Sequence, residues 1–336
     1  MKKSQDSKSF ALLAFAAIIA CAVFFFWGQY NTASTVFEVG FMLHHIDDLL
    51  DSADGYALSE EEQNQYDSLC EGGGDWEEFH ESVRGSYETE TVTKWFGEQA
   101  RERLNYWYYP QNSEKTVILL HGIAASDASI WAGTWWDMGF NVVIPDMRAD
   151  SGDRSSDTSV VTYGVYEQFD LYDLILHLGL QDSCVWVQGR GTGAAAAILL
   201  AGNDELSAAG VDGIVAESIY DNLGQTQRTL VKQLFNLGDH FVGTFLRNQI
   251  KTNLLFEADS VSISNYAAHS SVPMLFLCSE SDGFISSANT ERVYAAAGGE
   301  KAICRVPEAH HLLLALAEGS PCQTAIRDFV KSSLIP

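Results

Sequence analysis

The chain has 336 residues, enough for one large domain or two ordinary ones. Hydrophobic residues make up 46% and aromatic residues 12% of it, so we expect a large buried core and exclude extended disorder. Its 20 basic against 45 acidic side chains give a formal net charge of −25, which excludes a nucleic-acid partner held by its phosphates. The six cysteines lack CxxC or Cys–His spacing, so no structural zinc site is predicted, while one or two disulfides stay open.

The amino-terminal segment has the composition of a membrane anchor. Residues 10–27 form an uninterrupted uncharged run, near the lower limit for a helix that spans a bilayer, which takes about 20 residues. Three lysines precede the run, and no lysine or arginine follows until Arg84. The positive-inside rule therefore predicts a cytoplasmic tail (1–9), a transmembrane anchor (10–28) and an extracytoplasmic remainder.

Two other interpretations of this segment stay open. A cleaved signal peptide would have an apolar stretch of about 7–15 residues and a small-x-small cleavage site. Here the run is longer, and Thr32-Ala33-Ser34 is a poor site. Residues 18–21 resemble a lipoprotein cleavage box ending at Cys21, but the residues that follow stay strongly apolar. We expect an uncleaved, single-pass protein of the cell membrane.

Residues 29–90 are expected to form an acidic helical preface. Ser59 followed by Glu62 has the spacing of a capping box at a helix start. From residue 91 to the end at 336, short β-rich runs alternate with helical ones, which is typical of an α/β domain with a mostly parallel sheet. The mostly helical residues 222–268 interrupt this alternation and are expected to form a lid over the carboxyl edge of the sheet.

Eight segments have the length and composition of strands, and the first two are candidates for an antiparallel hairpin at the edge of the sheet. They are residues 91–96, 103–110, 116–122, 141–147, 184–189, 213–218, 274–280 and 302–307.

Chemically active residues follow several of these strands. In open α/β sheets, sites form outside the carboxyl ends of the strands. A turn of the form small-x-X-x-small, then an aspartate, then a histidine is the chain order of a nucleophile-elbow hydrolase. The residues at these positions are His121-Gly122, Gly189-Arg190-Gly191-Thr192-Gly193, Asp282 and His310-His311.

With these motifs, residues 91–335 resemble the α/β-hydrolase superfamily, and most of all its bacterial membrane-anchored or secreted branch of serine aminopeptidase-like or esterase-like proteins. The resemblance implies a mostly parallel eight-stranded sheet with helices on both faces and a helical lid, here preceded by one transmembrane helix. It is carried in order by VILLHG, NVVIPDMR, TYGVYEQFDLYDLILHL, VWVQGRGTGAAAA, VPMLFLCSESDGFIS and VPEAHH.

The resemblance also implies catalytic roles. The backbone N–H groups of Ile123 and Thr192 would line an oxyanion hole. His311 would be the base, and Asp282 would orient its ring. The Ala-Gly-His spacing of the family selects His311 over His310, which stands at the usual glycine. Two other interpretations stay open, namely Asp282 as a helix cap and His311 as a surface histidine.

The sequence departs from the family at the nucleophile. The middle position of the elbow, normally serine, is Gly191, which has no side chain with which to form an acyl-enzyme. Thr192 is one residue out of register with the elbow. In a well-studied triad, loss of the nucleophile lowers the rate about a million-fold. We therefore expect catalytic impairment, as in a pseudoenzyme.

Three functions stay open, so the sequence does not decide whether the chain is an enzyme. The first is a degenerate hydrolase that binds a small acyl or peptide-like ligand without cutting it. The second is an active hydrolase, through water activated by His311 and Asp282 or because a parent serine was changed to glycine. The third and most remote is a dinucleotide-binding module, since Gly189 to Ala194 fits G-x-G-x-x-[GA]. For the hydrolase interpretations no metal or organic cofactor is implied.

Overall fold

A computed structural model describes most of the chain from residue 21 onward. The expected tail, residues 10–20 of the expected anchor and Ile123 lie outside the described residues. Within the described part, no helix has the length and apolar character needed to cross a bilayer. The described residues are 21–34, 59–62, 64, 81–122, 128–148, 160–235, 242–311, 313–317, 319 and 321–334.

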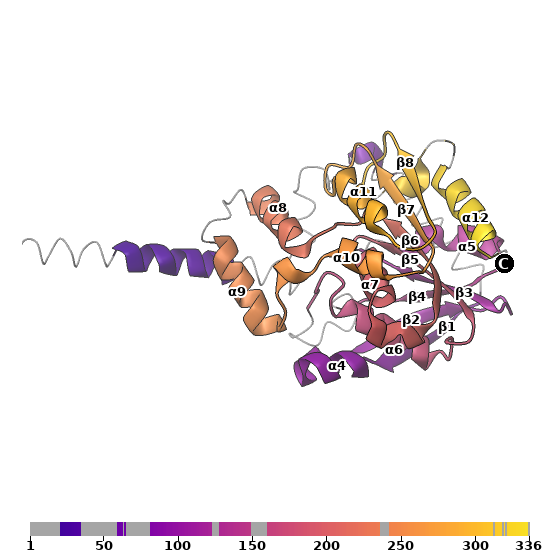
Figure 1. Cartoon of the computed structure of the whole chain (residues 1–336), viewed down its shortest axis with the longest axis horizontal. Helices are drawn as coiled ribbons and strands as arrows, with labels where there is room; N and C mark the ends of the chain where they lie inside the picture. Colours follow the sequence, from indigo (N-terminus) through magenta and orange to yellow (C-terminus); the bar gives the residue numbers. More distant parts are fainter. Residues whose placement is uncertain are drawn as a thin grey trace, which may run out of the picture.

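An eight-stranded sheet lies at the centre of the fold, in the order β1-β2-β4-β3-β5-β6-β7-β8 (Figure 1). From β4 to β8 in that order, neighbouring strands are parallel. At the other end of the sheet, β2 pairs antiparallel with both β4 and the edge strand β1. This confirms the expected α/β class with a mostly parallel sheet. The bounds are β1 Val83–Glu88, β2 Arg103–Tyr109, β3 Lys115–Leu120, β4 Asn141–Pro145, β5 Cys184–Arg190, β6 Val211–Glu217, β7 Met274–Ser279 and β8 Lys301–Val306.

The prediction of a strand over residues 91–96 is wrong, because Glu90–Phe96 forms helix α4. The β-branched composition of this segment favours a strand, but Val92 is buried and Phe96 packs on Tyr166 with ring centroids 4.3 Å apart. Burial at positions four apart matches the helical period, and this tertiary packing overrides the local preference. The edge strand is instead β1, which lies within the range expected to be a helical preface.

Alternate residues of the central strands enter two separate cores, one on each face of the sheet. Ile118 and Leu120 of β3 belong to one core, whereas Val117 and Leu119 belong to the other. The strands are therefore apolar on both faces, as expected for a covered parallel sheet. Helices α6 (Glu167–His177), α7 (Thr192–Ala201), α10 (Ile263–His269) and α11 (Ser287–Ala296) contribute to the first core, and α5 (Ala132–Asp137) and α12 (Pro321–Ser333) to the second.

Two helices extend the fold beyond the carboxyl edge of the sheet, and we call them the lid. They are α8 (Leu223–Phe235) and α9 (Val242–Leu254), which follow β6 in the chain. The expected insertion at residues 222–268 is thus helical, but its last helix, α10, packs on α7 and α11 and belongs to the main body. A helix over residues 21–34 meets the lid at α9 and projects away from the body (Figure 1).

Shorter elements complete the described part. The capping box at Ser59 is confirmed, since its N–H donates to Glu62 Oε2 at 2.9 Å and the Glu62 N–H donates to Ser59 Oγ at 3.3 Å. Short 3-10 helices are η1 Glu98–Ala100, η2 Ala128–Trp131, η3 Asp204–Ala209, η4 Ala258–Ser260 and η5 Leu314–Leu316.

Candidate active site

A tight turn at Gly191 joins β5 to α7. Gly191 has φ 49° and ψ −107°, a conformation that residues with a side chain rarely adopt. Its N–H donates to the Glu217 carbonyl at 2.9 Å, and its carbonyl accepts from the Ala195 N–H at 2.9 Å. The backbone here is therefore the strand–turn–helix of a nucleophile elbow, held on both sides by hydrogen bonds.

The two flanking glycines are required by close backbone contacts. A Cβ on Gly189 would lie 2.3 Å from the carbonyl carbon of Gly193, and a Cβ on Gly193 would lie 2.6 Å from Leu120 Cβ. At Gly191, in contrast, no atom of the described residues lies within 4 Å of the place that a Cβ would occupy. Of these three glycines, only the middle one has space for a side chain.

Asp282 and His311 form a buried pair at the same edge of the sheet. Asp282 follows β7 and His311 follows β8, and Asp282 Oδ2 lies 2.7 Å from His311 Nδ1. The other carboxylate oxygen, Oδ1, accepts from the N–H groups of Phe284 at 2.9 Å and Ile285 at 2.8 Å. The contact assigns the proton of a neutral imidazole to Nδ1 and makes Nε2 its basic nitrogen.

The surroundings of Asp282 favour its charged form. Burial alone would raise the pKa of this carboxyl, but the charge of His311 and hydrogen bonds from His311, Ile285 and Phe284 outweigh it and hold the pKa below its usual value. The Phe284 ring packs against the imidazole with centroids 5.2 Å apart. An ionised carboxylate behind a packed ring is the arrangement that orients a catalytic base.

Thr192 is the first residue of α7, so its N–H lies at a helix amino terminus, where negative charge is favoured. Its hydroxyl is buried and has no hydrogen-bond partner among the described residues. The other expected oxyanion donor, the N–H of Ile123, lies outside the described residues. Among the described residues, no three His, Cys, Asp or Glu side chains come together as metal ligands would.

The sequence leaves open whether Arg190 is solvated or paired with an acid, and in the structure it forms a buried ion pair beside the turn. Arg190 Nε donates to Glu217 Oε1 at 3.0 Å, and Trp131 Nε1 donates to Glu217 Oε2 at 2.9 Å. In a dinucleotide-binding module an acidic side chain at the end of the next strand would hold the ribose. Glu217 stands at that place but is buried and paired with Arg190 and Trp131, which speaks against the dinucleotide interpretation. A cavity of about 10 Å³, roughly the space of one water molecule, lies among these side chains and is also lined by Gln188, whose Nε2 has no partner in the described residues.

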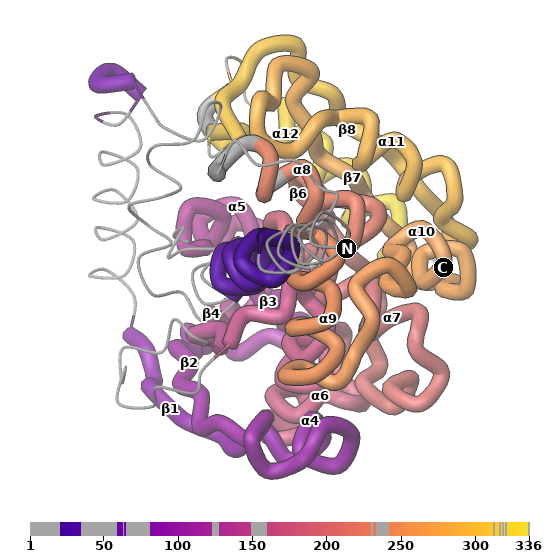
Figure 2. Tube along the Cα trace, turned by 90° about the vertical axis from the view of Figure 1, so that its left-hand side faces the viewer, coloured from indigo at the N-terminus to yellow at the C-terminus, as the bar shows by residue number. Residues whose placement is uncertain are grey.

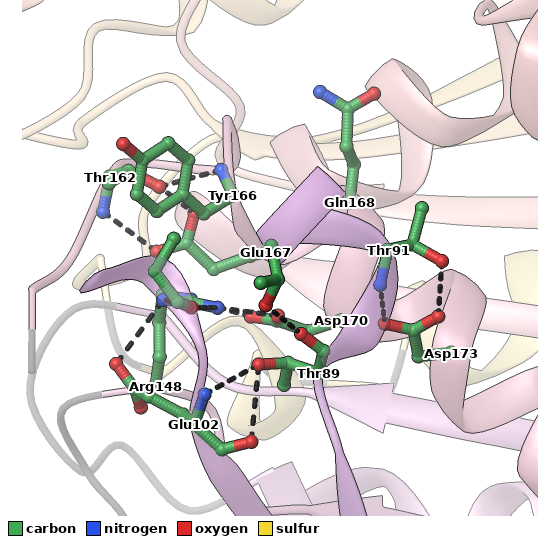
Figure 3. A network of polar contacts seen from close by, with 12 residues as sticks. Thr89, Thr91, Glu102, Arg148, Thr162, Tyr166, Glu167, Gln168, Asp170 and Asp173 are labelled. Atoms are coloured by element: carbon green, nitrogen blue, oxygen red, sulfur yellow. Dashed lines mark hydrogen bonds and ion pairs between the residues drawn. The ribbon is translucent and has the colours of Figure 1, made fainter. Parts of the chain in front are cut away.

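The NVVIPDMR motif ends in a structural arginine. Arg148 is buried, and its Nε and Nη2 donate to the two oxygens of Asp170 at 2.6 Å each, while Nη1 donates to Glu102 Oε1 at 3.2 Å (Figure 3). Nearby, Asp173 on α6 accepts from the Thr91 N–H at 2.8 Å. Burial raises the pKa of Asp170, and Arg148 opposes this shift. The network joins α4 and β2 to α6, away from the elbow, and we assign it to stability.

Comparisons with known proteins agree with this architecture, although no family model matches the sequence. A Bacillus subtilis (strain 168) protein described as "Uncharacterized protein YqkD" is 24% identical over 217 residues, covering 62% of this chain and 68% of the relative. The Pyrococcus furiosus esterase Pf2001 has a TM-score of 0.53 and 19% identity, over 75% of this chain and 93% of the esterase.

A second solved structure, the Pyrococcus horikoshii acylaminoacyl peptidase, has a TM-score of 0.51 and 15% identity, over 77% of this chain and 43% of the peptidase. At these identities the likeness concerns the fold. Together with the strand order and the elbow, it shows that this chain has the α/β-hydrolase fold that the esterase and the peptidase share.

Proposed function

We propose that this protein is a membrane-anchored, extracytoplasmic member of the serine hydrolase lineage that binds a small acyl or peptide-like ligand and lacks ordinary serine catalysis. The observation that carries the proposal is Gly191. It has the backbone conformation of the elbow, and among the described residues no atom lies within 4 Å of where a Cβ would stand, while Asp282 and His311 remain paired at 2.7 Å. Without a hydroxyl at this position no acyl-enzyme forms.

The remaining groups suit binding. The N–H of Thr192 at the start of α7 favours a carboxylate or carbonyl oxygen. Gly191 has no side chain that could attack the bound group. Such a site holds an acyl or peptide end in a geometry that its relatives would use for cleavage.

Anchoring to the membrane rests on the apolar run at residues 10–27 and on its described part. In the helix over residues 21–34, Phe24 is 71% and Trp27 58% exposed, which is unfavourable in water. The lysines before the run favour an extracytoplasmic main domain.

A second candidate function is hydrolysis. The oriented imidazole of His311 favours it, because a water in the open space above Gly191 would lie on the same sheet edge as this base. A parent enzyme whose serine was changed to glycine is the other route to the same activity.

The test compares the unaltered chain with Gly191→Ser. We expect Gly191→Ser to react with an alkyl fluorophosphonate and to hydrolyse p-nitrophenyl acetate, and Gly191→Ser/His311→Ala to do neither. The unaltered chain should bind butyrate in a calorimeter without turning over the ester. Labelling of the unaltered chain by the phosphonate, or an inert and correctly folded Gly191→Ser, would refute the proposal. Ester turnover by the unaltered chain that is lost in His311→Ala would instead establish the water mechanism.

A further inference from the structure

The helix over residues 21–34 is joined to the lid by side-chain contacts. The ring of Tyr30 meets Phe245 of α9 edge to face, with centroids 5.9 Å apart and an interplanar angle of 87°. Gln249 Nε2 donates to Ser34 Oγ at 2.8 Å, and Ala33 is fully buried. The end of this helix is therefore fixed to α9.

The preceding part of the same helix exposes apolar side chains on every side. The exposed fractions are 63% for Val23, 71% for Phe24, 49% for Phe25, 45% for Phe26 and 58% for Trp27. Successive residues of a helix are about 100° apart, so these five cover its whole circumference. A protein partner would cover one stripe of such a helix, whereas a lipid bilayer surrounds it completely.

The insertion at residues 222–268, which contains the lid, is less acidic than the rest of the chain. Residues 222–268 contain four basic and three acidic side chains, whereas the whole chain has 20 and 45. Basic side chains of the lid pair with acidic ones that follow it in the chain, with Arg228 Nη1 2.6 Å from Asp259 Oδ1 and Lys251 Nζ 2.5 Å from Glu257 Oε1. A nearly neutral surface is the part of this chain that anionic lipid headgroups repel least.

The lid also lies at the edge of the sheet that carries the site. Gly191, Asp282 and His311 follow the carboxyl ends of β5, β7 and β8, and α8 begins after the neighbouring strand β6. Figure 2, which looks along the helix over residues 21–34, shows this helix in front of the body with α8 and α9 beside it. The face toward which this helix projects is thus the face on which the lid lies.

The geometry points to a lipid bilayer as the partner of the lid: α8 and α9 rest against the headgroups, and the ligand enters the site from the membrane as an amphiphile with an acyl chain. This inference rests on the acyl-ligand function proposed above and deepens it. Because Tyr30 and Ser34 at the end of the helix over residues 21–34 contact α9, this helix fixes the distance between the bilayer and the lid.

Depth measurements test the docking. The full chain is placed in phosphatidylcholine vesicles that contain a lipid with a nitroxide on its headgroup, with a fluorescent amino acid at Asn248 or at Asp182. Both positions are exposed. Asn248 is on α9, whereas Asp182 precedes β5 and so lies at the amino ends of the strands, opposite the site. We expect quenching at Asn248 to exceed that at Asp182 several-fold, and to decrease in Phe245→Ala/Gln249→Ala. Equal quenching at the two positions would overturn the docking.

Photolabelling tests the route of the ligand. The probes are a phosphatidylcholine with a diazirine in its acyl chain and a water-soluble diazirine butyrate. We expect the lipid probe to label peptides that contain Gly191 or His311 in addition to residues 21–34. Labelling of those peptides by butyrate alone would refute entry from the membrane and leave the proposed function standing. Strong quenching at Asn248 without labelling by either probe would refute the acyl ligand itself and keep the docking.

Discussion

Arg190 Nε lies 3.0 Å from Glu217 Oε1, next to the turn at Gly191. The two residues are partners across the ladder of β5 and β6, and both side chains are almost fully buried. Trp131, at the end of η2, donates to the second oxygen of the same carboxylate. The buried carboxylate of Glu217 thus connects the turn at Gly191 with η2.

We expect Arg190→Met to destabilise the protein by about 3–5 kcal/mol, because it leaves Glu217 as a buried charge without its cation. The double variant Arg190→Met/Glu217→Leu should be clearly more stable than the single one. The measurement is urea unfolding followed by tryptophan fluorescence. Arg327→Met is the matched control, since Arg327 pairs with Asp137 on the surface at 3.2 Å and its loss should change stability by less than about 1 kcal/mol. Similar losses in the two single variants would contradict the assignment.

The glycines of the elbow should differ in their tolerance of alanine. Gly191→Ala has free space but keeps a positive φ, so we expect a loss of about 1–2 kcal/mol. Gly189→Ala places its Cβ 2.3 Å from the Gly193 backbone and should lose at least twice as much stability. Thermal melting of the two variants at one pH compares them directly, and a more damaging Gly191→Ala would show that the turn is packed differently.

The stability contributed by Asp282 should depend on pH. Because the folded-state pKa of Asp282 is lowered, its carboxylate stabilises the fold fully above the unfolded-state pKa of about 3.9, and this contribution is lost as the pH falls through the folded value. We expect Asp282→Asn to be destabilised by about 1–3 kcal/mol near pH 7, through loss of hydrogen bonds to a charged group. The difference in melting temperature between Asp282→Asn and the unaltered chain should become smaller only below about pH 4. A gap that grows on acidification would contradict the paired geometry.

Cys304 should be the most reactive thiol of the late strands. The hydrogen bond with Cys322 lowers the pKa of Cys304 to about 7, whereas burial raises the pKa of Cys278 to about 11. Since the thiolate is the reactive form, iodoacetamide at pH 7 to 8 should modify Cys304 at least about tenfold faster than Cys278. Peptide mass spectrometry measures both rates. In Cys322→Ala the advantage of Cys304 should shrink markedly, and an unchanged rate would show that Cys322 is not its cause.

Much of the fold could be predicted from the sequence because its strands are buried on both faces. Continuous apolar runs such as residues 184–189 and 274–280 have few other interpretations between turn residues, and their strand bounds agree within two residues. The segment 91–96 failed because its β-branched residues favour a strand locally, while its contact with α6 is invisible in the sequence.

The candidate site divides in the same way. The order of Gly191, Asp282 and His311 along the chain was readable because sites on parallel sheets lie at strand ends, and the structure pairs Asp282 with His311. The contact between Arg190 and Glu217 could not be predicted, because a charged residue beside a turn is as often exposed to solvent as paired. Only the register of β5 and β6 brings the two side chains to the same face.

The guanidinium of Arg148 contacts segments that are far apart in the chain, Glu102 before β2 and Asp170 in α6, and itself follows β4. Elements that depend on one buried cation lose their hydrogen bonds to it together. Hydrogen exchange of the backbone amides in β2, β4 and the first turns of α6 should therefore follow a single opening free energy, separate from that of the central strands, so that this edge of the sheet behaves as one cooperative unit.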